Sequence, residues 1–341
     1  MRIIRGVPRH RPTPLMHVDP APHLLIPHAS AASEAGAAAL KVVKLPNLAA
    51  LLARLQPLAD AAPEADADEY SLSAPHERAL AALHGWSGED GRLPWAAAAA
   101  ADDGLRADTD TSGAPWGRLT PVHWHVGSDS VTLVDPAALA LDEAESRALF
   151  EAVKPSFDAE GWTLLWGAPL RWHVRHEALG GLACASLDRA VGRNLDLWMS
   201  DAPEARRLRR MQVEAQMIWH DHPVNAAREE ARALTVNSFW LDGCGAAQPR
   251  RPLAEAGVQV DERLRAPLLA GDWAAWVDAW QALDAGPVAA LRARAEAGAP
   301  VTLTLCGERH ARRFGLKPRG WLSRLMGAPR PADASALLAS L

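Results

Sequence analysis

The residues best suited to ligand chemistry are concentrated in one short stretch, HPVNAAREEARALTVNSFWLDGCG, which runs from His222 to Gly245. Its polar and aromatic candidates are Asn225, Arg228, Asn237, Ser238, Trp240 and Asp242. A guanidinium holds a carboxylate or phosphate in a bidentate fork, so Arg228 indicates an anionic ligand. Alternatively, the two Asn side chains satisfy backbone groups at helix ends, and Arg228 pairs with a neighbouring acid. The residue types leave both interpretations open.

The local sequence predicts a helix, a short helix and then a strand across this stretch. Pro223 disfavours helix at the residue before it, so the long helix over 204–222 ends near His222. Asn225 is the predicted N-cap of the short helix that carries Arg228. A strand over 234–241 then places Val236, Ser238 and Trp240 on one face, and Asn237, Phe239 and Leu241 on the other.

The segment Asp242-Gly243-Cys244-Gly245 is expected to follow that strand. Ligands of α/β sheets often bind outside the carboxyl ends of strands, which favours a site at Asp242. Glycine allows a positive φ and a close backbone approach, and we expect Gly243 and Gly245 to serve the turn.

A second group of polar residues precedes this stretch. The segment LDRAVGRNLDLW contains Asp188, Arg189 and Arg193, and MQVEAQMIWHDH contains Gln212 on a helix. We interpret them first as a polar network between helices. Arg193 and Gln212 are also candidate ligand-binding residues, provided that a cleft exposes them.

Metal-ligand and nucleophile motifs are weak in this sequence. His220 and His222 point about 200° apart on a helix and so chelate poorly. His17, Asp19, His23 and His28 are further candidate ligands. The chain lacks HExxH, CxxC pairs, GxSxG, a P-loop and GxGxxG. We therefore expect no metal ion and no cofactor.

Two further residues, His76 and Cys306, each allow a functional and a structural interpretation. His76, in the segment PHER at a predicted helix start, is either an acid/base group or part of an ordinary polar surface. Cys306 ends a late strand at a glycine and is either exposed or, as we prefer, a buried small apolar residue.

Composition narrows the class of protein. The 341 residues are 49% hydrophobic and 23% charged, which is typical of a globular chain. The net charge is −5 and the 36 Lys and Arg residues are dispersed, so nucleic-acid binding is not expected. No apolar run is long enough for a membrane span, and none follows the Arg-rich start as a signal peptide requires. The three Cys residues are far apart and odd in number, which indicates a cytoplasmic protein without a disulfide framework.

The periodicity predicts an α/β or α+β fold with a mixed sheet flanked by helices and a strand-rich hairpin subdomain. Hairpins are predicted over 120–135 and 161–174, a buried strand over His23–Pro27 and a helix over 44–59. Trp273, Trp276 and Trp280 share one helix face and are expected in the core. We expect residues 1–20 to form an extended arm. Residues 21–341 form either one domain or two subdomains that divide near 96–114.

Four motifs carry a resemblance to a known family. They are SAPHERALAALHGW, RLTPVHWHVGSDSVTLVDP, SLDRAVGRNLDLW and MQVEAQMIWHDHPVNAAREEARALTVNSFWLDGCG, all within Ser71–Glu308. Together they resemble the RpfE-type regulatory proteins of proteobacteria. A weaker similarity links the last motif to archaeal-type cofactor-independent phosphoglycerate mutases, which have a His-Pro-x-Asn…Arg segment and then a strand that contains Asn and ends in Gly-x-Gly.

The chain departs from those mutases at their two-metal site. The mutases supply Asp after their first strand, whereas this chain reads HASAASEAG after HLLIP. Phosphoryl transfer of that type needs the two cations for charge neutralisation. The resemblance thus implies a cytoplasmic, non-catalytic regulatory protein that binds a small anionic ligand or a protein partner. The alternatives are a mutase-like enzyme acting on phosphorylated three-carbon acids, and an interaction protein with a Trp-rich surface.

Overall fold

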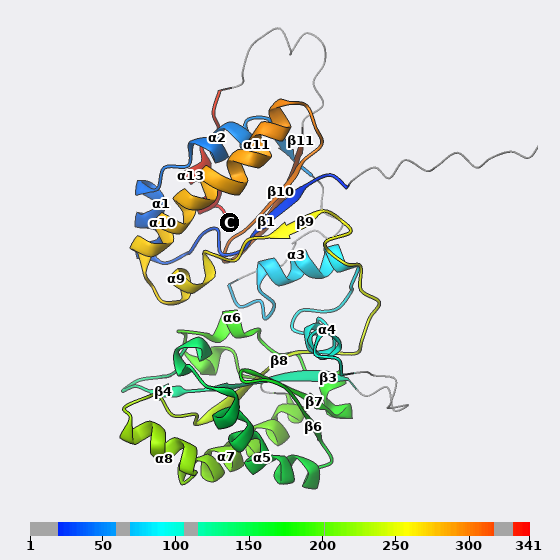
Figure 1. Cartoon of the computed structure of the whole chain (residues 1–341), viewed down its shortest axis with the longest axis vertical. Helices are drawn as coiled ribbons and strands as arrows, with labels where there is room; N and C mark the ends of the chain where they lie inside the picture. Colours follow the sequence, from blue (N-terminus) through cyan, green and yellow to red (C-terminus); the bar gives the residue numbers. More distant parts are fainter. Residues whose placement is uncertain (1–19, 59–68, 106–114, 201, 317–329) are drawn as a thin grey trace, which may run out of the picture.

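The computed structural model describes residues 20–58, 69–105, 115–200, 202–316 and 330–341. They form two lobes, each with its own sheet and core, stacked along the long axis of the molecule (Figure 1). The upper lobe contains both ends of the described chain, and the lower lobe contains its middle. The mixed α/β fold class predicted from the sequence is confirmed.

The upper lobe is built on a mixed five-stranded sheet in the order β2-β11-β10-β1-β9. Its strands are β1 (His23–Ile26), β2 (Leu55–Pro57), β9 (Val258–Val260), β10 (Thr302–Cys306) and β11 (Ala311–Leu316). β1 lies parallel to both β9 and β10, so these three strands end at the same edge of the sheet. The predicted buried strand therefore lies inside the sheet, between two parallel neighbours, and every residue of β1 is buried.

Helices cover one face of this sheet and enclose the upper core (Figure 1). They are α1 (Glu34–Val42), α2 (Pro46–Leu52), α10 (Trp273–Leu283), the π-helical turn η5 (Asp284–Val288), α11 (Ala289–Glu296) and α13 (Ala334–Ala339), with α9 (Arg265–Leu269) at the lobe's lower end. Trp276 and Trp280 are fully buried there and Trp273 packs against them, as their spacing predicts.

The predicted helix over 44–59 is wrong in its second half. Only Pro46–Leu52 is helical, because the chain turns and Leu55–Pro57 pairs with the edge strand β11. The leucines are buried as expected, but backbone pairing with a distant strand outweighs helical spacing at the end of the segment.

The lower lobe is built on an antiparallel sheet in the order β6-β7-β3-β8, with a separate hairpin of β4 and β5. Its strands are β3 (Trp116–Val122), β4 (Trp124–Val126), β5 (Val131–Leu133), β6 (Thr163–Ala168), β7 (Arg171–Arg175) and β8 (Ser238–Gly245). The second predicted hairpin is confirmed, as β6 pairs with β7. The first is confirmed only near its turn, where β4 pairs with β5, because Thr120–Val122 belongs to β3 and pairs with β8.

Helices cover both faces of this second sheet. Below it in Figure 1 lie α5 (Glu143–Ala159), α7 (Pro203–His220) and α8 (Pro223–Glu230). On the face toward the upper lobe lie α4 (Trp95–Asp102) and α6 (Leu187–Ala190). Short 3-10 turns complete the lobe: η2 (Pro136–Leu139), η3 (Glu177–Gly180) and η4 (Leu195–Leu197).

Helix α3 (Pro75–His84) lies between the lobes and packs near β10 and β11. The predicted seam at 96–114 begins inside α4, which packs on β3 and β8, and residues 106–114 lie outside the described residues. Most of the predicted N-terminal arm, 1–19, also lies outside them.

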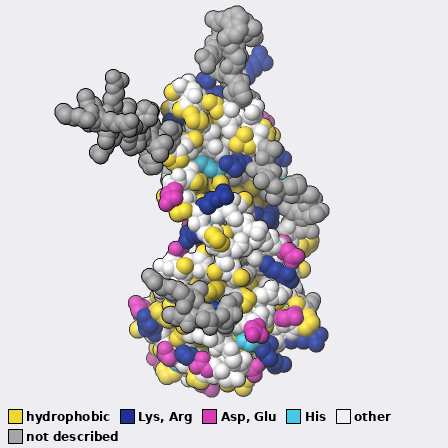
Figure 2. Space-filling model, turned by 90° about the vertical axis from the view of Figure 1, so that its right-hand side faces the viewer, with side chains coloured by type: hydrophobic (Ala, Val, Ile, Leu, Met, Phe, Trp, Pro, Cys, Tyr) yellow, Lys and Arg dark blue, Asp and Glu magenta, His cyan; other side chains and the backbone are white. Residues whose placement is uncertain are grey.

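The surface mixes charges of both signs. On the face shown in Figure 2, Lys and Arg side chains are interspersed with Asp and Glu. None of the described Trp residues is exposed, so these rings form no surface patch. Among the described residues, no single helix is long and apolar enough to cross a membrane; only α1 and α2 taken together, bent by 89°, meet that test of length and composition.

Candidate functional site between the lobes

A cleft of about 300 Å³ opens where the upper lobe, α3 and the lower lobe meet. Its lining includes the carboxyl ends of β1 and β10, the start of α3 and the segment that contains α6. Six of the lining residues carry its chemistry: His28, His76, Asp188, Arg189, Arg193 and Glu308. Carboxyl ends of parallel strands favour ligand sites, and here β1 and β10 supply that edge.

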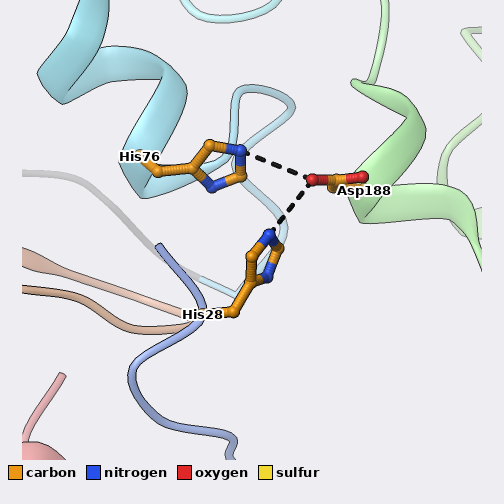
Figure 3. Close-up of side chains that lie close together, drawn as sticks. All are labelled: His28, His76 and Asp188. Carbon is orange, nitrogen blue, oxygen red and sulfur yellow. Dashed lines mark ion pairs between the residues drawn. The ribbon is translucent and has the colours of Figure 1, made fainter. Parts of the chain in front are cut away.

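His28 follows β1 in an unusual backbone conformation. Its φ is 57°, in the left-handed region that non-glycine residues seldom adopt. The surrounding fold holds this turn, since the backbone N–H of the next residue, Ala29, donates to the carbonyl of Cys306 at 2.8 Å. The turn directs the imidazole of His28 toward the lower lobe (Figure 3).

His76 and Asp188 approach His28 from two other elements. His76 is the second residue of α3, after Pro75, and Asp188 belongs to α6 of the lower lobe. The Nε2 atoms of His28 and His76 lie 3.3 and 3.4 Å from the same oxygen, Oδ2 of Asp188 (Figure 3). The other oxygen, Oδ1, accepts two hydrogen bonds from Arg265, at 2.9 and 2.5 Å.

Burial and pairing set the charges of this cluster. Burial lowers the pKa of His28, and the contact with Asp188 only partly offsets that effect. Burial alone raises the pKa of Asp188, but the contacts with His28 and His76 and the charge of Arg265 hold it well below its usual value. A neutral His28 beside an ionised Asp188 is the charge state in which both groups can act as metal ligands.

Two guanidinium groups also line the cleft. Arg189 is only 2% exposed; its Nη1 donates to the carbonyl of Glu308 at 2.8 Å. Nε and Nη2 of Arg189 have no hydrogen-bond partner among the described residues. Arg193 pairs with the carboxylate of Glu308, whose other oxygen accepts a hydrogen bond from the backbone N–H of Ala32 at 2.6 Å.

Glu77 adds a partly buried acid close to this cleft. Burial and the nearby charges of Asp242 and Asp188 raise its pKa to about 7, although its carboxylate accepts a hydrogen bond from the backbone N–H of Ala74. Arg118 lies in the same network and forms a bidentate pair with Asp242, at 2.7 Å for both hydrogen bonds.

The polar residues that the sequence groups between His222 and Gly245 do not form one site. Asn225 and Arg228 lie within the lower lobe, whereas Trp240 and Asp242 contact the segment beside the cleft. Asn225 is buried, and its amide contacts the backbone of Trp219 and Val236 through three hydrogen bonds of 2.8 to 3.0 Å. Arg228 donates to the carbonyls of Leu234 and Leu139 and pairs with Glu145. These contacts account for both side chains within the protein, as the second interpretation of the sequence requires.

Three details of the predicted local structure are wrong. The N-cap of α8 is His222, whose Nδ1 accepts from Val224, while Asn225 lies inside the helix. The strand contains Asp242–Gly245 instead of ending before them, because pairing with β3 continues to Gly245. Val236 precedes the strand and packs with Phe239, so strand alternation does not apply to it.

Two other residues predicted to bind a ligand, Asn237 and Gln212, instead form hydrogen bonds with the protein's own backbone. Asn237 clamps the backbone of Trp124 with hydrogen bonds of 2.7 and 2.9 Å, and Gln212 donates to the carbonyl of Phe239. Ser238 is fully buried in β8, and its hydroxyl has no hydrogen-bond partner among the described residues.

Trp240 and Asp242 act closer to the cleft. The indole of Trp240 donates to the carbonyl of Ala185, and Asp242 accepts from the backbone N–H of Leu187 at 3.1 Å. These two contacts hold the segment that leads directly into Asp188 and Arg189. Arg193 is the one predicted ligand-binding residue that lines the cleft itself.

The sequence did not reveal that His28, His76 and Asp188 meet. The sequence instead predicts separate roles for them, with His28 as a possible ligand, His76 as an acid/base group and Asp188 as part of a polar network. Only a strand end followed by His, and a helix start with His after Pro, hinted at them. The thiols of Cys184 and Cys244, far apart in sequence, likewise lie 3.5 Å apart, while Cys306 is buried as expected.

Comparisons with known proteins give distant structural likenesses. No protein-family model and no curated protein matches the sequence. A cofactor-independent phosphoglycerate mutase from Thermoplasma acidophilum DSM 1728 is 15% identical, with a TM-score of 0.37, over 94% of this chain and 95% of that chain. The PH0037 protein from Pyrococcus horikoshii is 12% identical, with a TM-score of 0.44, over 94% of this chain and 93% of that chain. At TM-scores below 0.5, neither likeness assigns this chain an activity.

Proposed function

We propose that this protein binds a small anionic ligand, a phosphate or carboxylate, in the cleft between its lobes. The observation that carries the proposal is Arg189, a guanidinium that lines the cleft, is 2% exposed and has two nitrogens without a partner among the described residues. Buried guanidinium donors are normally satisfied, because a charged group without partners in the interior is costly. A bound anion would supply the missing acceptors.

The electrostatics around Arg189 support the same conclusion. Burial, together with the charges of Arg193 and Arg78, lowers its pKa to about 10, and the carboxylates of Glu308 and Asp90 only partly offset this effect. Three cations close together repel one another, so an added anion between or beside them would stabilise all three. Phosphate and carboxylate oxygens match the forked geometry of guanidinium donors.

Glu308 indicates where the anion would bind. Its carboxylate already contacts Arg193 and the backbone N–H of Ala32, so this part of the cleft accepts a carboxylate within the protein itself. A ligand would either bind beside it, against Arg189, or displace it from Arg193. The size of the cleft, about 300 Å³, suits a small metabolite.

Two finer hypotheses follow from the sequence resemblance. In the first, the anion regulates a cytoplasmic protein of the RpfE type, which has no catalytic activity and passes the signal to a protein partner. In the second, the protein is a mutase-like enzyme that acts on phosphorylated three-carbon acids. Both hypotheses make 3-phosphoglycerate a rational first probe.

Isothermal titration calorimetry tests the proposal. Inorganic phosphate and 3-phosphoglycerate are titrated into the full chain in the presence of a chelator. We expect Arg189→Met to weaken binding by roughly tenfold to a hundredfold, the loss typical of a charge-assisted hydrogen-bonded pair. Arg210→Met, which removes an exposed guanidinium from α7, should leave affinity unchanged.

Two results decide among the hypotheses. Equal affinity in the wild type and Arg189→Met, or no binding of either probe to the wild type, would overturn the proposed cleft site. In a separate assay supplemented with divalent cations, conversion of 3-phosphoglycerate into 2-phosphoglycerate by the wild type, abolished by chelator, would favour the enzyme over the regulatory protein.

A further inference from the structure

We infer that His28, His76 and Asp188 form a binding site for one divalent transition-metal ion of the zinc class, which joins the two lobes. This inference does not depend on the proposed anion. The three ligand atoms, Nε2 of each imidazole and Oδ2 of Asp188, all lie within 4.8 Å of one another. They come from the turn after β1, from the start of α3 and from α6 (Figure 3).

The distances fit the coordination of such an ion. Zinc binds imidazole nitrogen and carboxylate oxygen at about 2.0–2.1 Å, so two ligand atoms of a tetrahedral site lie about 3.3–3.4 Å apart. The two distances from Asp188 to the imidazoles are 3.3 and 3.4 Å. The two imidazole nitrogens lie within 4.8 Å of each other, so a shift of at most about 1.5 Å would complete the same geometry.

The ligand types favour a transition metal. Two imidazoles and one carboxylate suit Zn²⁺, Fe²⁺ or Co²⁺, whereas Mg²⁺ and Ca²⁺ prefer sites made of oxygen atoms alone. Three protein ligands leave the fourth coordination position of a tetrahedral ion open. All three residues line the cleft. An exogenous group could therefore reach the ion.

The surroundings orient the ligands in advance. Arg265 binds Oδ1 of Asp188 with two hydrogen bonds, which leaves Oδ2 turned toward both imidazoles. Such supporting contacts are typical of metal ligands, since they fix the orientation of the coordinating atom. Arg265 also neutralises part of the carboxylate charge, so we expect moderate affinity.

The backbone at His28 provides independent support. A positive φ at a non-glycine residue is strained and persists where the surrounding structure imposes it, which occurs frequently at functional sites. Glycine would relieve the strain at this position. The residue at this position is nevertheless a histidine, and its imidazole contacts both other ligands. It lies 3.3 Å from Asp188, and its ring centroid is 4.8 Å from that of His76.

Metal titration of the full-length protein, stripped with a chelator and then dialysed, tests the site. Co²⁺ binding is followed by its visible absorption, and Zn²⁺ binding by calorimetry. We expect one equivalent with a tetrahedral or five-coordinate cobalt spectrum. His28→Gly and His76→Gln should each weaken binding at least about a hundredfold, since even supporting residues account for tenfold to a hundredfold.

The controls separate ligand loss from unfolding and from adventitious binding. His28→Gly removes the ligand while relieving backbone strain, and the thermal midpoint of each metal-free variant reports on folding. His220→Ala removes an imidazole that is 81% exposed and distant from the site in sequence, and it should bind like the wild type.

Undiminished cobalt absorption in both His28→Gly and His76→Gln, or no stoichiometric binding by the wild type, would overturn the metal site. Because the anion titration is performed with a chelator, its outcome is independent of this result. Anion binding without metal binding would leave the proposed function standing, and metal binding without anion binding would leave the metal site standing.

Discussion

The Nε2 atom of His28 lies 3.3 Å from Oδ2 of Asp188, although the first residue lies in the turn after a strand of the upper lobe and the second belongs to a helix of the lower lobe. This contact places a titratable pair at the junction of two separate cores. The junction therefore contains both the candidate metal ligands and the buried guanidinium of Arg189, and its stability can be tested apart from ligand binding.

Asp188→Asn is expected to lower the free energy of unfolding by roughly 1.5–3 kcal/mol in the presence of a chelator, because Arg265 loses its charged acceptor. The pKa of Asp188 is depressed in the folded state, so its stabilisation is present above the unfolded pKa, about 4, and is lost as pH falls through the lower folded value. Urea unfolding at pH 7 measures the difference. Asp196→Asn, on the exposed surface of the lower lobe, is the matched control.

Glu77 should make the protein less stable as pH rises from about 4.5 to about 7. Its folded pKa of about 7 exceeds its unfolded value of 4.5, so the folded state binds more protons in this interval and stability falls with increasing pH. Glu77→Gln keeps the acceptor for Ala74 and removes the titration; it should flatten this part of the profile. The difference is at most about 3 kcal/mol, and we expect less because the side chain is only partly buried. Parallel profiles for both proteins would contradict this role of Glu77.

Asn225→Ala should destabilise the lower lobe without changing anion affinity. The substitution removes the side-chain partner of the Val236 carbonyl and of the Val236 N–H, at a cost of about 2–3 kcal/mol, whereas the Trp219 carbonyl still accepts from the backbone N–H of His222. Asn225→Asp retains the acceptor for Val236 but loses the donors, so it separates the two contributions. Reduced phosphate affinity in a folded Asn225→Ala protein would restore the ligand-facing interpretation of this residue.

Gly243→Ala is expected to cost more than about 2 kcal/mol, because two effects combine. The residue has a φ of 64°, and an added Cβ would lie 2.8 Å from the backbone nitrogen of Ala96 in α4. Gly161 has a φ of 79° but no atom within 4 Å of its virtual Cβ, so Gly161→Ala reports the conformational cost alone. Equal thermal midpoints for the two variants would show that the contact between α4 and β8 is not tight.

Elements that depend on neighbouring residues were predictable from the sequence. The hairpins β4–β5 and β6–β7, the apolar strand β1 and the Trp face of α10 follow from alternation, turn residues and helical spacing, which act within a few residues. The need for a glycine at position 243 was also apparent, although its place inside β8 was not, because that depends on pairing with β3.

The sequence by itself determined the mixed α/β class, the local turns and the types of chemically capable residues. Only the tertiary structure decided which of those residues share a site. His28, His76 and Asp188 meet because parallel strands β1 and β10, helix α3 and a helix of the other lobe converge at one edge, and no local spacing encodes that convergence. For the same reason, Asn225 binds backbone groups and Arg228 pairs with Glu145, so neither side chain reaches the cleft. Trp240 and Asp242 instead hold the segment that precedes Asp188.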